Sequence, residues 1–169
     1  MSKVVEFKSG GEETRIENWE RLLANSAACP ISSVRERLTG AGLIPTRQRV
    51  YIGWLLFGGG DRHVTADILF EEVRRKGITL SLATIYNTLT QFKAAGLVRE
   101  VAIYGGKTWF DTNTGPHYHF FDEENRTMAD IPDDVFQLPS IPNVPEGMEV
   151  VGVDVVVRIR SKAKPTDEH

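Results

Sequence analysis

Cysteine and long apolar runs are scarce in this chain, and each scarcity excludes a class of protein. Among 169 residues there is one cysteine, Cys29, which excludes an intramolecular disulfide framework and a zinc site built from a Cys-x-x-Cys pair. A transmembrane helix needs about 20 consecutive apolar residues, and the best apolar run, residues 51–57, is far shorter. No secretory signal pattern is visible at the N-terminus. We therefore expect a cytoplasmic protein, without a membrane partner, that binds any metal ion through histidines and carboxylates.

Charge is unevenly distributed along the chain, although the formal net charge is only −3. Residues 31–111 carry 11 basic and 7 acidic side chains, a net charge of +4, whereas residues 112–169 carry 5 and 11, a net charge of −6. Clustered positive charge is what a polyanionic partner requires. The composition therefore predicts that the middle of the chain binds a polyanion and that the C-terminal part has another task.

Helical patterns dominate residues 31–95, after an N-terminal arm at residues 1–30. Capping residues and apolar spacing predict four helices: one around Val34 and Leu38 capped by Ser32 or Ser33, one from Pro45 to Phe57, one capped by Thr65 with Ile68, Leu69 and Val73 inward and Gly77 past its end, and one capped by Ser81 with Leu82, Ile85, Leu89 and Phe92 buried. Strands at residues 97–103 and 108–111 follow, with a glycine pair between them. This order predicts a winged helix-turn-helix domain over residues 31–112.

The pattern changes after residue 112, where we expect a small α/β dimerisation domain over residues 113–162 and a tail at residues 163–169. Residues 117–122 and 128–131 resemble short strands, and the alternating valines of residues 151–159 predict the strongest strand in the chain. Three strands with little helical cover form a poor core for one subunit. The fold class is therefore α+β, and the exposed sheet face predicts a homodimer.

The helix that begins at Ser81 is the candidate recognition helix, because the second helix of a helix-turn-helix lies in the major groove. Threonine and alanine methyl groups can contact thymine, and asparagine can bind adenine through two hydrogen bonds. The alternative is that Ser81 only caps the helix and that Thr84 and Asn87 are only solvated. Candidate DNA-binding residues are Ser81, Ala83, Thr84 and Asn87 for bases or phosphates, and Arg47, Arg49 and Lys107 for phosphates or the minor groove.

Two histidines separated by one residue form a second candidate site. Alternate residues of a strand share a face, so His117 and His119 can bind one ion at about 2.0–2.1 Å per Zn–N bond while Tyr118 points away. His63 and Asp111 are expected near the junction between the domains, where a bound ligand would change the inter-domain angle. For the histidines the alternative is a purely structural or surface role.

Cys29, which precedes a proline, is a third candidate, because a thiolate can be an axial haem ligand. The alternative is an inert thiol. No Ser/His/Asp arrangement, phosphate-binding glycine loop or isolated carboxylate pair appears in the sequence, so we predict that the protein is not an enzyme. A metal-dependent enzyme that uses the histidines and Asp111 is the alternative from another functional class.

Several motifs occur in an order that resembles the ferric uptake regulator superfamily: residues 42–49, 63–66, 81–89 and 105–111. Within it, residues 53–57, the histidine cluster and the ending at residues 153–158 are most similar to the iron response regulator (Irr) branch. Many relatives hold a structural zinc with a Cys-x-x-Cys pair after the histidines, whereas residues 120–125 contain no cysteine. That zinc site is therefore expected to be absent.

The resemblance implies a homodimer, joined through its C-terminal sheet, that binds AT-rich operator double-stranded DNA. It implies that Tyr86 is a DNA-contacting residue and that Lys107 is the wing lysine. It also implies metal or haem positions at or beside His63, Asp111, His117 and His119. Members of the Irr branch repress haem synthesis and iron-using genes when iron is scarce, and haem then inactivates them, with a haem-delivering enzyme as a further partner.

Two regulatory hypotheses follow from these observations. The first is an iron- or haem-responsive transcriptional repressor that haem releases from DNA. The alternative is a repressor of the same superfamily that needs Fe²⁺ or Mn²⁺ as corepressor, with Zn²⁺ as a further ion that the same ligands can bind.

Overall fold

The computed structural model describes residues 31–103, 106–132, 134, 140 and 143–162. Cys29, the predicted arm and the predicted tail lie outside these described residues. Within the described ranges, no helix combines the length and apolar character that a bilayer crossing requires. The helices of this part of the chain are α2 (Ile31–Gly40), α3 (Arg47–Phe57), α4 (Ala66–Arg75) and α5 (Leu82–Ala94).

Capping side chains set the starts of three helices. The predicted caps Thr65 and Ser81 are confirmed, since each hydroxyl accepts a hydrogen bond from the backbone N–H three residues later. The prediction that Pro45 opens α3 is wrong, because Thr46 caps that helix and α3 begins at Arg47. The prediction of a serine cap for α2 is also wrong, because α2 already begins at Ile31.

The main core lies between the helices and the first sheet. Leu89 and Phe92 of α5 are fully buried, as predicted, together with Leu56 of α3. Two residues predicted to face this core are instead exposed: Leu82 by 42% and Ile68 by 36%. Both belong to the first turn of their helix, and in α4 it is Ala66 of that turn that is buried in the core instead.

The first sheet contains the predicted hairpin, which is formed by the second and third strands below and which we call the wing. It also contains one strand that the sequence did not reveal. Its strands are β1 (His63–Val64), β2 (Arg99–Val101) and β3 (Trp109–Asp111), in the antiparallel order β1-β3-β2. The two-residue strand β1 is too short to show an alternating pattern. Because β1 pairs with β3, His63 is fixed beside Asp111 at the end of the wing.

The second sheet has the order β5-β4-β6, from β4 (Tyr118–Asp122), β5 (Thr127–Ile131) and β6 (Val156–Ile159). β4 pairs antiparallel with β5 and parallel with β6. The prediction of a long strand over residues 151–159 is only partly right, because residues 151–155 are not in a strand and Val151 is 95% exposed. Residues 156–159 pair with β4, and the Val155 carbonyl accepts a hydrogen bond from the His119 N–H at 3.0 Å, whereas the alternating pattern extends back to residue 151.

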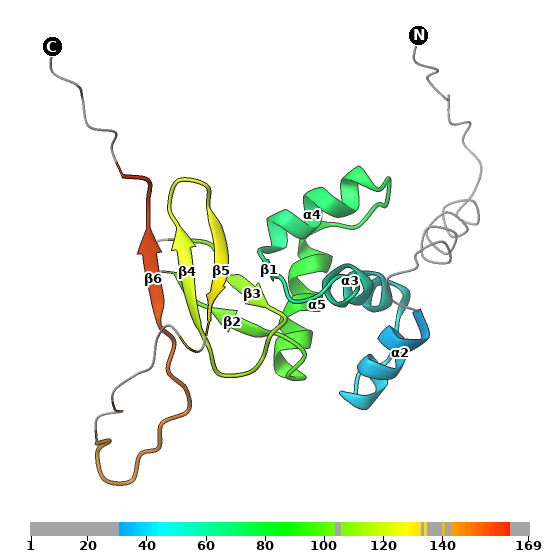
Figure 1. Ribbon diagram of the computed structural model, residues 1–169. Helices are drawn as coiled ribbons and strands as arrows, with labels where there is room; N and C mark the ends of the chain where they lie inside the picture. Colours follow the sequence, from blue (N-terminus) through cyan, green and yellow to red (C-terminus); the bar gives the residue numbers. More distant parts are fainter. Residues whose placement is uncertain (1–30, 104–105, 133, 135–139, 141–142, 163–169) are drawn as a thin grey trace, which may run out of the picture.

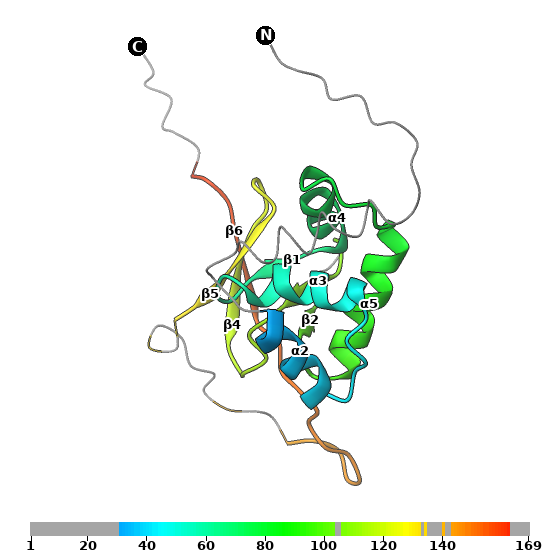
Figure 2. The same cartoon turned by 90° about the vertical axis from the view of Figure 1, so that its right-hand side faces the viewer.

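The first sheet lies between the helices and the second sheet, as Figure 1 shows; Figure 2 views the molecule from its helical side. A small apolar cluster joins the two sheets: Val101 and Trp109 of the wing pack with Phe121 of β4 and Met128 of β5. The predicted α+β class is confirmed. The wing is therefore in direct contact with the C-terminal sheet, and polar residues can meet where the two sheets approach each other.

Candidate metal centre

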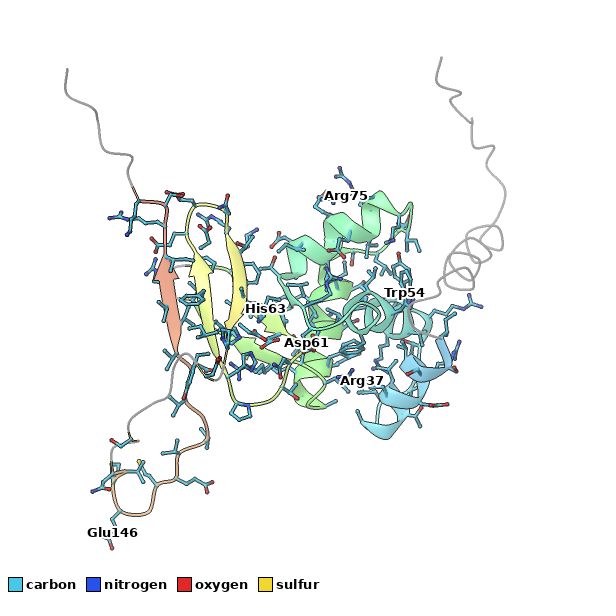
Figure 3. All side chains as sticks on the ribbon, in the orientation of Figure 1. Arg37, Trp54, Asp61, His63, Arg75 and Glu146 are labelled. Atoms are coloured by element: carbon cyan, nitrogen blue, oxygen red, sulfur yellow. The ribbon has the colours of Figure 1, made fainter. Side chains whose placement is uncertain are left out.

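Five side chains from both sheets converge at this junction, and Figure 3 shows His63 there between the helices and the second sheet. One ligand atom from each side chain lies within 4.8 Å of the others. The structure thus brings together all four residues that the sequence suggested, and adds one that it did not. The five are His63 in β1, Asp111 at the end of β3, His117 just before β4, His119 in β4 and Asp130 in β5.

Strand register explains why these residues meet. His63 lies opposite Asp111 across the β1–β3 pair, and His119 lies opposite Asp130 across the β4–β5 pair. Each sheet therefore contributes one histidine–carboxylate pair, and directly opposed residues on neighbouring strands have side chains in mutual reach. His117 joins the second pair because it lies two residues before His119 and shares its face.

The distances between these side chains are those of a compact polar cluster. Asp111 Oδ2 lies 2.9 Å from His117 Nε2 and accepts a hydrogen bond from His119 Nε2 at 3.2 Å. Asp130 Oδ1 lies 2.8 Å from His63 Nε2 and 3.2 Å from His117 Nε2. Asp111 and His119 have no exposed surface, whereas the Asp130 side chain is 34% exposed, so the cluster is sheltered on one side and reaches the surface at Asp130.

Several of these atoms are buried without a hydrogen-bonding partner. Among the described residues, no hydrogen bond of acceptable geometry reaches His63 Nε2, His117 Nε2 or Asp130 Oδ1. An unpaired buried polar atom costs about 1–3 kcal/mol, and a cation that accepts their lone pairs removes that cost. Imidazole and carboxylate donors suit Fe²⁺, Mn²⁺ and Zn²⁺, so the donor set fits a divalent metal ion.

The neighbouring backbone orients the His117 imidazole. His117 Nδ1 donates to the carbonyl oxygen of Gly115 at 2.9 Å, since a carbonyl can only accept. This bond fixes the tautomer and leaves the Nε2 lone pair directed at the cluster, an arrangement typical of metal-binding histidines. Arg99 of β2 holds the same loop through its Nη1 and Nη2 donors to the carbonyls of Gly115 and His117, at 3.0 and 3.3 Å.

Electrostatic coupling within the cluster shifts two pKa values in opposite directions. Burial by itself lowers the pKa of His63, but the facing carboxylates of Asp111 and Asp130 outweigh burial and raise it above 6.5. Burial raises the pKa of Asp111, but the adjacent imidazoles of His119 and His63 and the backbone N–H of Asn113 hold that pKa well below its usual range. Without a metal ion, the cluster therefore favours a carboxylate beside a protonated imidazole.

Asp130 is the member of the cluster that sequence reasoning missed. The signal was available, because residues 117–122 and 128–131 were expected to be strands around a turn. Aligning that hairpin places Asp130 opposite His119. A carboxylate directly across from a candidate histidine ligand is a stronger indication than either residue alone.

The candidate DNA-binding residues of α5 fall into two environments. Ala83, Tyr86 and Asn87 are exposed, and the Tyr86 ring packs edge-on against Phe110 with ring centroids 6.4 Å apart. The Ser81 and Thr84 side chains hydrogen-bond locally. The Ser81 hydroxyl accepts from the Thr84 N–H at 3.1 Å and lies 2.8 Å from the Thr84 hydroxyl. The capping role that was the alternative for Ser81 is thus present.

The three basic candidates also differ in their surroundings. Arg47 is exposed at the start of α3, and the exposed Lys107 lies 2.9 Å from the Asp67 carboxylate. Arg49 instead makes contacts within the protein: Nη1 donates to the Ile44 carbonyl at 2.8 Å and Nε donates to Gln91 Oε1 at 3.0 Å. Arg49 therefore connects the start of α3 to α5.

Comparison with known sequences finds similarity over most of the chain. The model of the "Ferric uptake regulator family" matches residues 40–157. A ferric uptake regulation protein of Pseudomonas putida is 33% identical over 127 residues, which are 74% of this chain and 95% of that protein. The peroxide-responsive repressor PerR of Staphylococcus aureus is 32% identical over 126 residues, covering 75% of this chain and 76% of that one. A match of 34% identity to the Legionella pneumophila ferric uptake regulation protein spans 49% of this chain and 61% of that protein.

Solved structures agree with this result. The ferric uptake regulator of Pseudomonas aeruginosa with manganese is 28% identical, has a TM-score of 0.57, and is matched over 76% of this chain and 98% of its own. The Vibrio cholerae ferric uptake regulator, 24% identical, shares the fold with a TM-score of 0.60 over 75% of this chain and 98% of its own. With its helices, wing and polar junction, the chain therefore belongs to the ferric uptake regulator family.

Proposed function

We propose that this protein is a homodimeric transcriptional repressor whose α5 binds operator DNA when Fe²⁺ or Mn²⁺ occupies the five-residue centre. The observation that carries the proposal is the convergence of three histidines and two carboxylates from both sheets, with unpartnered buried atoms directed at one point. The manganese-bound ferric uptake regulator of Pseudomonas aeruginosa supports this choice of ion. The proposal makes the protein a regulator rather than an enzyme.

The dimensions of the centre favour an ion over haem as its ligand. All five ligand atoms lie within 4.8 Å of one another, and two of the five side chains have no exposed surface. A single ion can be reached by all five donors at that spacing, whereas a porphyrin would have to separate them. Haem release, assignment to the Irr branch and a haem-delivering partner rest on the sequence resemblance alone and stay predictions, as does a haem role for Cys29.

Regulation follows from the way the ligands are divided between the sheets. A bound divalent ion supplies the positive charge that both carboxylates can share. His63 and Asp111 belong to the sheet that contains the wing, whereas His119 and Asp130 belong to the second sheet and His117 directly precedes its strand β4. When all five residues bind together, they fix the angle between the winged helix-turn-helix and the second sheet, and so the separation of two α5 helices in a dimer.

DNA recognition is assigned to the exposed face of α5 and the basic side chains beside it. Ala83, Tyr86 and Asn87 are exposed there and can contact bases, with methyl and amide groups suited to an AT-rich operator. Arg47 and Lys107 are available for phosphates. For Arg49 and Ser81, whose donors and acceptors are engaged within the protein, we propose that they position α5 rather than read the bases.

Dimerisation is assigned to residues 113–162, and DNA binding to residues 31–112. Val151, Val153, Val157 and Ile159 lie in or just before β6 and are exposed by 37% or more. Apolar residues at alternating positions next to a sheet edge are suited to burial against a second copy of the chain. A symmetric dimer would in turn present two α5 helices to a palindromic site.

The proposal is tested by selecting duplexes from a random-sequence library with chelator-treated protein, with and without Mn²⁺. The affinity for a selected duplex is then measured by fluorescence anisotropy at fixed salt, because phosphate contacts make it salt-dependent. We expect tight binding only with Mn²⁺. Equal binding by the metal-free protein, or tight metal-free binding that haem abolishes, would overturn the corepressor proposal, and the second result would support the haem-release hypothesis.

A further inference from the structure

Arg62, the residue before His63, connects the metal-binding junction to two helices. Its Nη1 donates to the Leu55 carbonyl in α3, and its Nη2 donates to Glu72 Oε1 in α4, both at 2.6 Å. A guanidinium presents donors in a fixed plane, so one side chain can hold two partners in a defined geometry. The position of α3 relative to α4 is therefore fixed through the residue that adjoins a candidate metal ligand.

The backbone of Arg62 is also attached to the opposite strand of the junction. The Arg62 N–H donates to Thr112 Oγ1 at 2.8 Å, and the Thr112 N–H donates to the Arg62 carbonyl oxygen at 3.1 Å. Thr112 directly follows Asp111. The two candidate ligands of the first sheet, His63 and Asp111, therefore cannot shift without moving the segment from which the Arg62 side chain extends.

The Arg62–Glu72 pair differs from an ordinary surface ion pair on the same helix. The Arg62 and Glu72 side chains are only 27% and 24% exposed, and Glu72 also acts on α3: burial raises the pKa of Tyr51 to about 12, and the negative charge of Glu72 contributes to this shift. The neighbouring Glu71 instead faces Arg74 within α4 at 3.8 Å, and both are well exposed. Exposed pairs of that kind contribute little.

We propose that Arg62 and Glu72 are positioning residues that transmit metal occupancy from the centre to α3 and α4. This inference rests on the proposed metal-dependent DNA binding. When the metal ligands draw β1 towards the second sheet, the Arg62 guanidinium carries α3 and α4 with it, and α5 follows because it packs against both. Neither residue contacts the metal or the DNA in this account.

The test compares Glu72→Gln with Glu71→Gln, the same substitution one position earlier on α4. Three quantities are measured for each variant: Mn²⁺ affinity, duplex affinity without metal, and the ratio of duplex affinities with and without Mn²⁺. For Glu72→Gln we expect the first two to change by less than about twofold and the ratio to fall by about tenfold, within the usual range of coupling between sites. Glu71→Gln should match the unmodified protein.

Hydrogen exchange of the α4 amides gives a second readout that does not require DNA. Mn²⁺ should increase amide protection in the unmodified protein and in Glu71→Gln, but not in Glu72→Gln. Arg62→Lys is the second variant, since it keeps the charge but not the two-pronged geometry. We expect this variant to lose most of the increase in duplex affinity that Mn²⁺ produces, with an unchanged far-ultraviolet circular dichroism spectrum.

The outcomes separate this inference from the proposed function. A ratio for Glu72→Gln equal to that of the unmodified protein overturns the inference and leaves the proposed function intact. A loss of Mn²⁺ affinity in proportion to the ratio also overturns it, because Glu72 would then support the centre itself. If the unmodified protein shows no metal dependence, the proposed function fails and the inference fails with it.

Discussion

The helical half of this molecule, which comprises α2 to α5 and the first sheet, differs from the second sheet in how it buries its apolar side chains. The helices surround a continuous core in which Leu56, Leu89 and Phe92 are fully buried. Within the described ranges, the second sheet contributes two buried residues, Phe121 and Met128, to a small cluster against which the partly buried Val156 packs, and two wing residues complete that cluster. The helical half can therefore be stabilised by its own packing, whereas the second sheet depends on its neighbours: the wing, the polar junction and, in the proposed dimer, a second copy of the chain.

The location of the polar cluster follows from this difference. A group of three histidines and two carboxylates, of which Asp111 and His119 are fully buried, lies at the junction between the two sheets. Buried charged groups must be paired or bind a metal to be tolerated. In the proposed function, a bound ion would both compensate these groups and join the strongly packed half to the weakly packed one, and the junction would then respond to metal.

The largest expected effect is on the free energy of unfolding, and it compares a buried residue of the helical core with an exposed residue of the second sheet. Phe92→Ala should lower the free energy of unfolding by about 3–5 kcal/mol, because it leaves a cavity in the helical core. Val157→Ala, on the exposed face of β6, should change it by less than about 0.5 kcal/mol in dilute protein, yet weaken self-association. Urea unfolding and sedimentation at several concentrations measure both. Similar destabilisation by the two variants would contradict the proposed difference between the halves.

The next largest effect concerns the ligand that the second sheet adds. Asp130→Asn keeps the side-chain shape but removes the charge, and it should reduce Mn²⁺ affinity by about 10- to 100-fold, the range found for residues that support metal sites. Asp134→Asn is the matched control, since Asp134 is exposed and is not part of the cluster. Isothermal titration calorimetry measures both. Equal affinities would remove Asp130 from the centre.

Protons should compete with the metal at the junction. Because the pKa of His63 is raised above 6.5 and metal binding requires neutral imidazole, Mn²⁺ affinity should fall by about tenfold for each pH unit below that raised pKa. Metal-free stability should change in the opposite direction: the His63 contribution is fully present below 6.5 and is lost as the pH rises through the folded-state pKa. Titration calorimetry and urea unfolding between about pH 6 and about pH 8 measure the two trends, and parallel trends would contradict this reasoning.

The smallest effects concern DNA recognition by the helical half. Lys107→Gln should weaken binding to all duplexes alike by a few-fold and reduce the salt slope by about 1. Asn87→Ala should instead change sequence preference, by about 1–3 kcal/mol at one base pair. Anisotropy titrations on a panel of single-base variants, each at two salt concentrations, separate the two behaviours. The opposite pattern would mean that the wing reads bases and that α5 contacts phosphates.

Local rules predicted the four helices of the described chain from the sequence, although not the starts of α2 and α3 or the exposure of Ile68 and Leu82. Thr65 and Ser81 cap their helices as expected, and Leu89 and Phe92 point into the core, because capping and helical spacing depend on residues only a few positions apart. The sheet was harder to predict. Residues 151–155 have the pattern of a strand but lie outside the β4–β6 pairing, apart from one hydrogen bond from the His119 N–H to the Val155 carbonyl. Strand formation depends on a neighbour that the pattern does not specify.

Four of the five residues in the centre could be proposed from the sequence, but their meeting could not be derived from spacing alone. His117 and His119 share a face by strand geometry, whereas His63 reaches them through a two-residue strand that no periodicity reveals. Asp130 required the hairpin register. The engagement of Arg49 with Ile44 and Gln91 depends on packing between α3 and α5, so only the structure could separate this arginine from the basic residues available to DNA.

The central claim is that residues from both sheets bind one divalent ion, and X-ray absorption at the manganese edge of the Mn²⁺-loaded protein tests it most directly. The account predicts one ion per chain with a mixed nitrogen and oxygen first shell and the outer-shell scattering of more than one imidazole, reduced by a His63→Ala substitution in the first sheet and by His119→Ala in the second. An oxygen-only shell, or a spectrum that either substitution leaves unchanged, would contradict it.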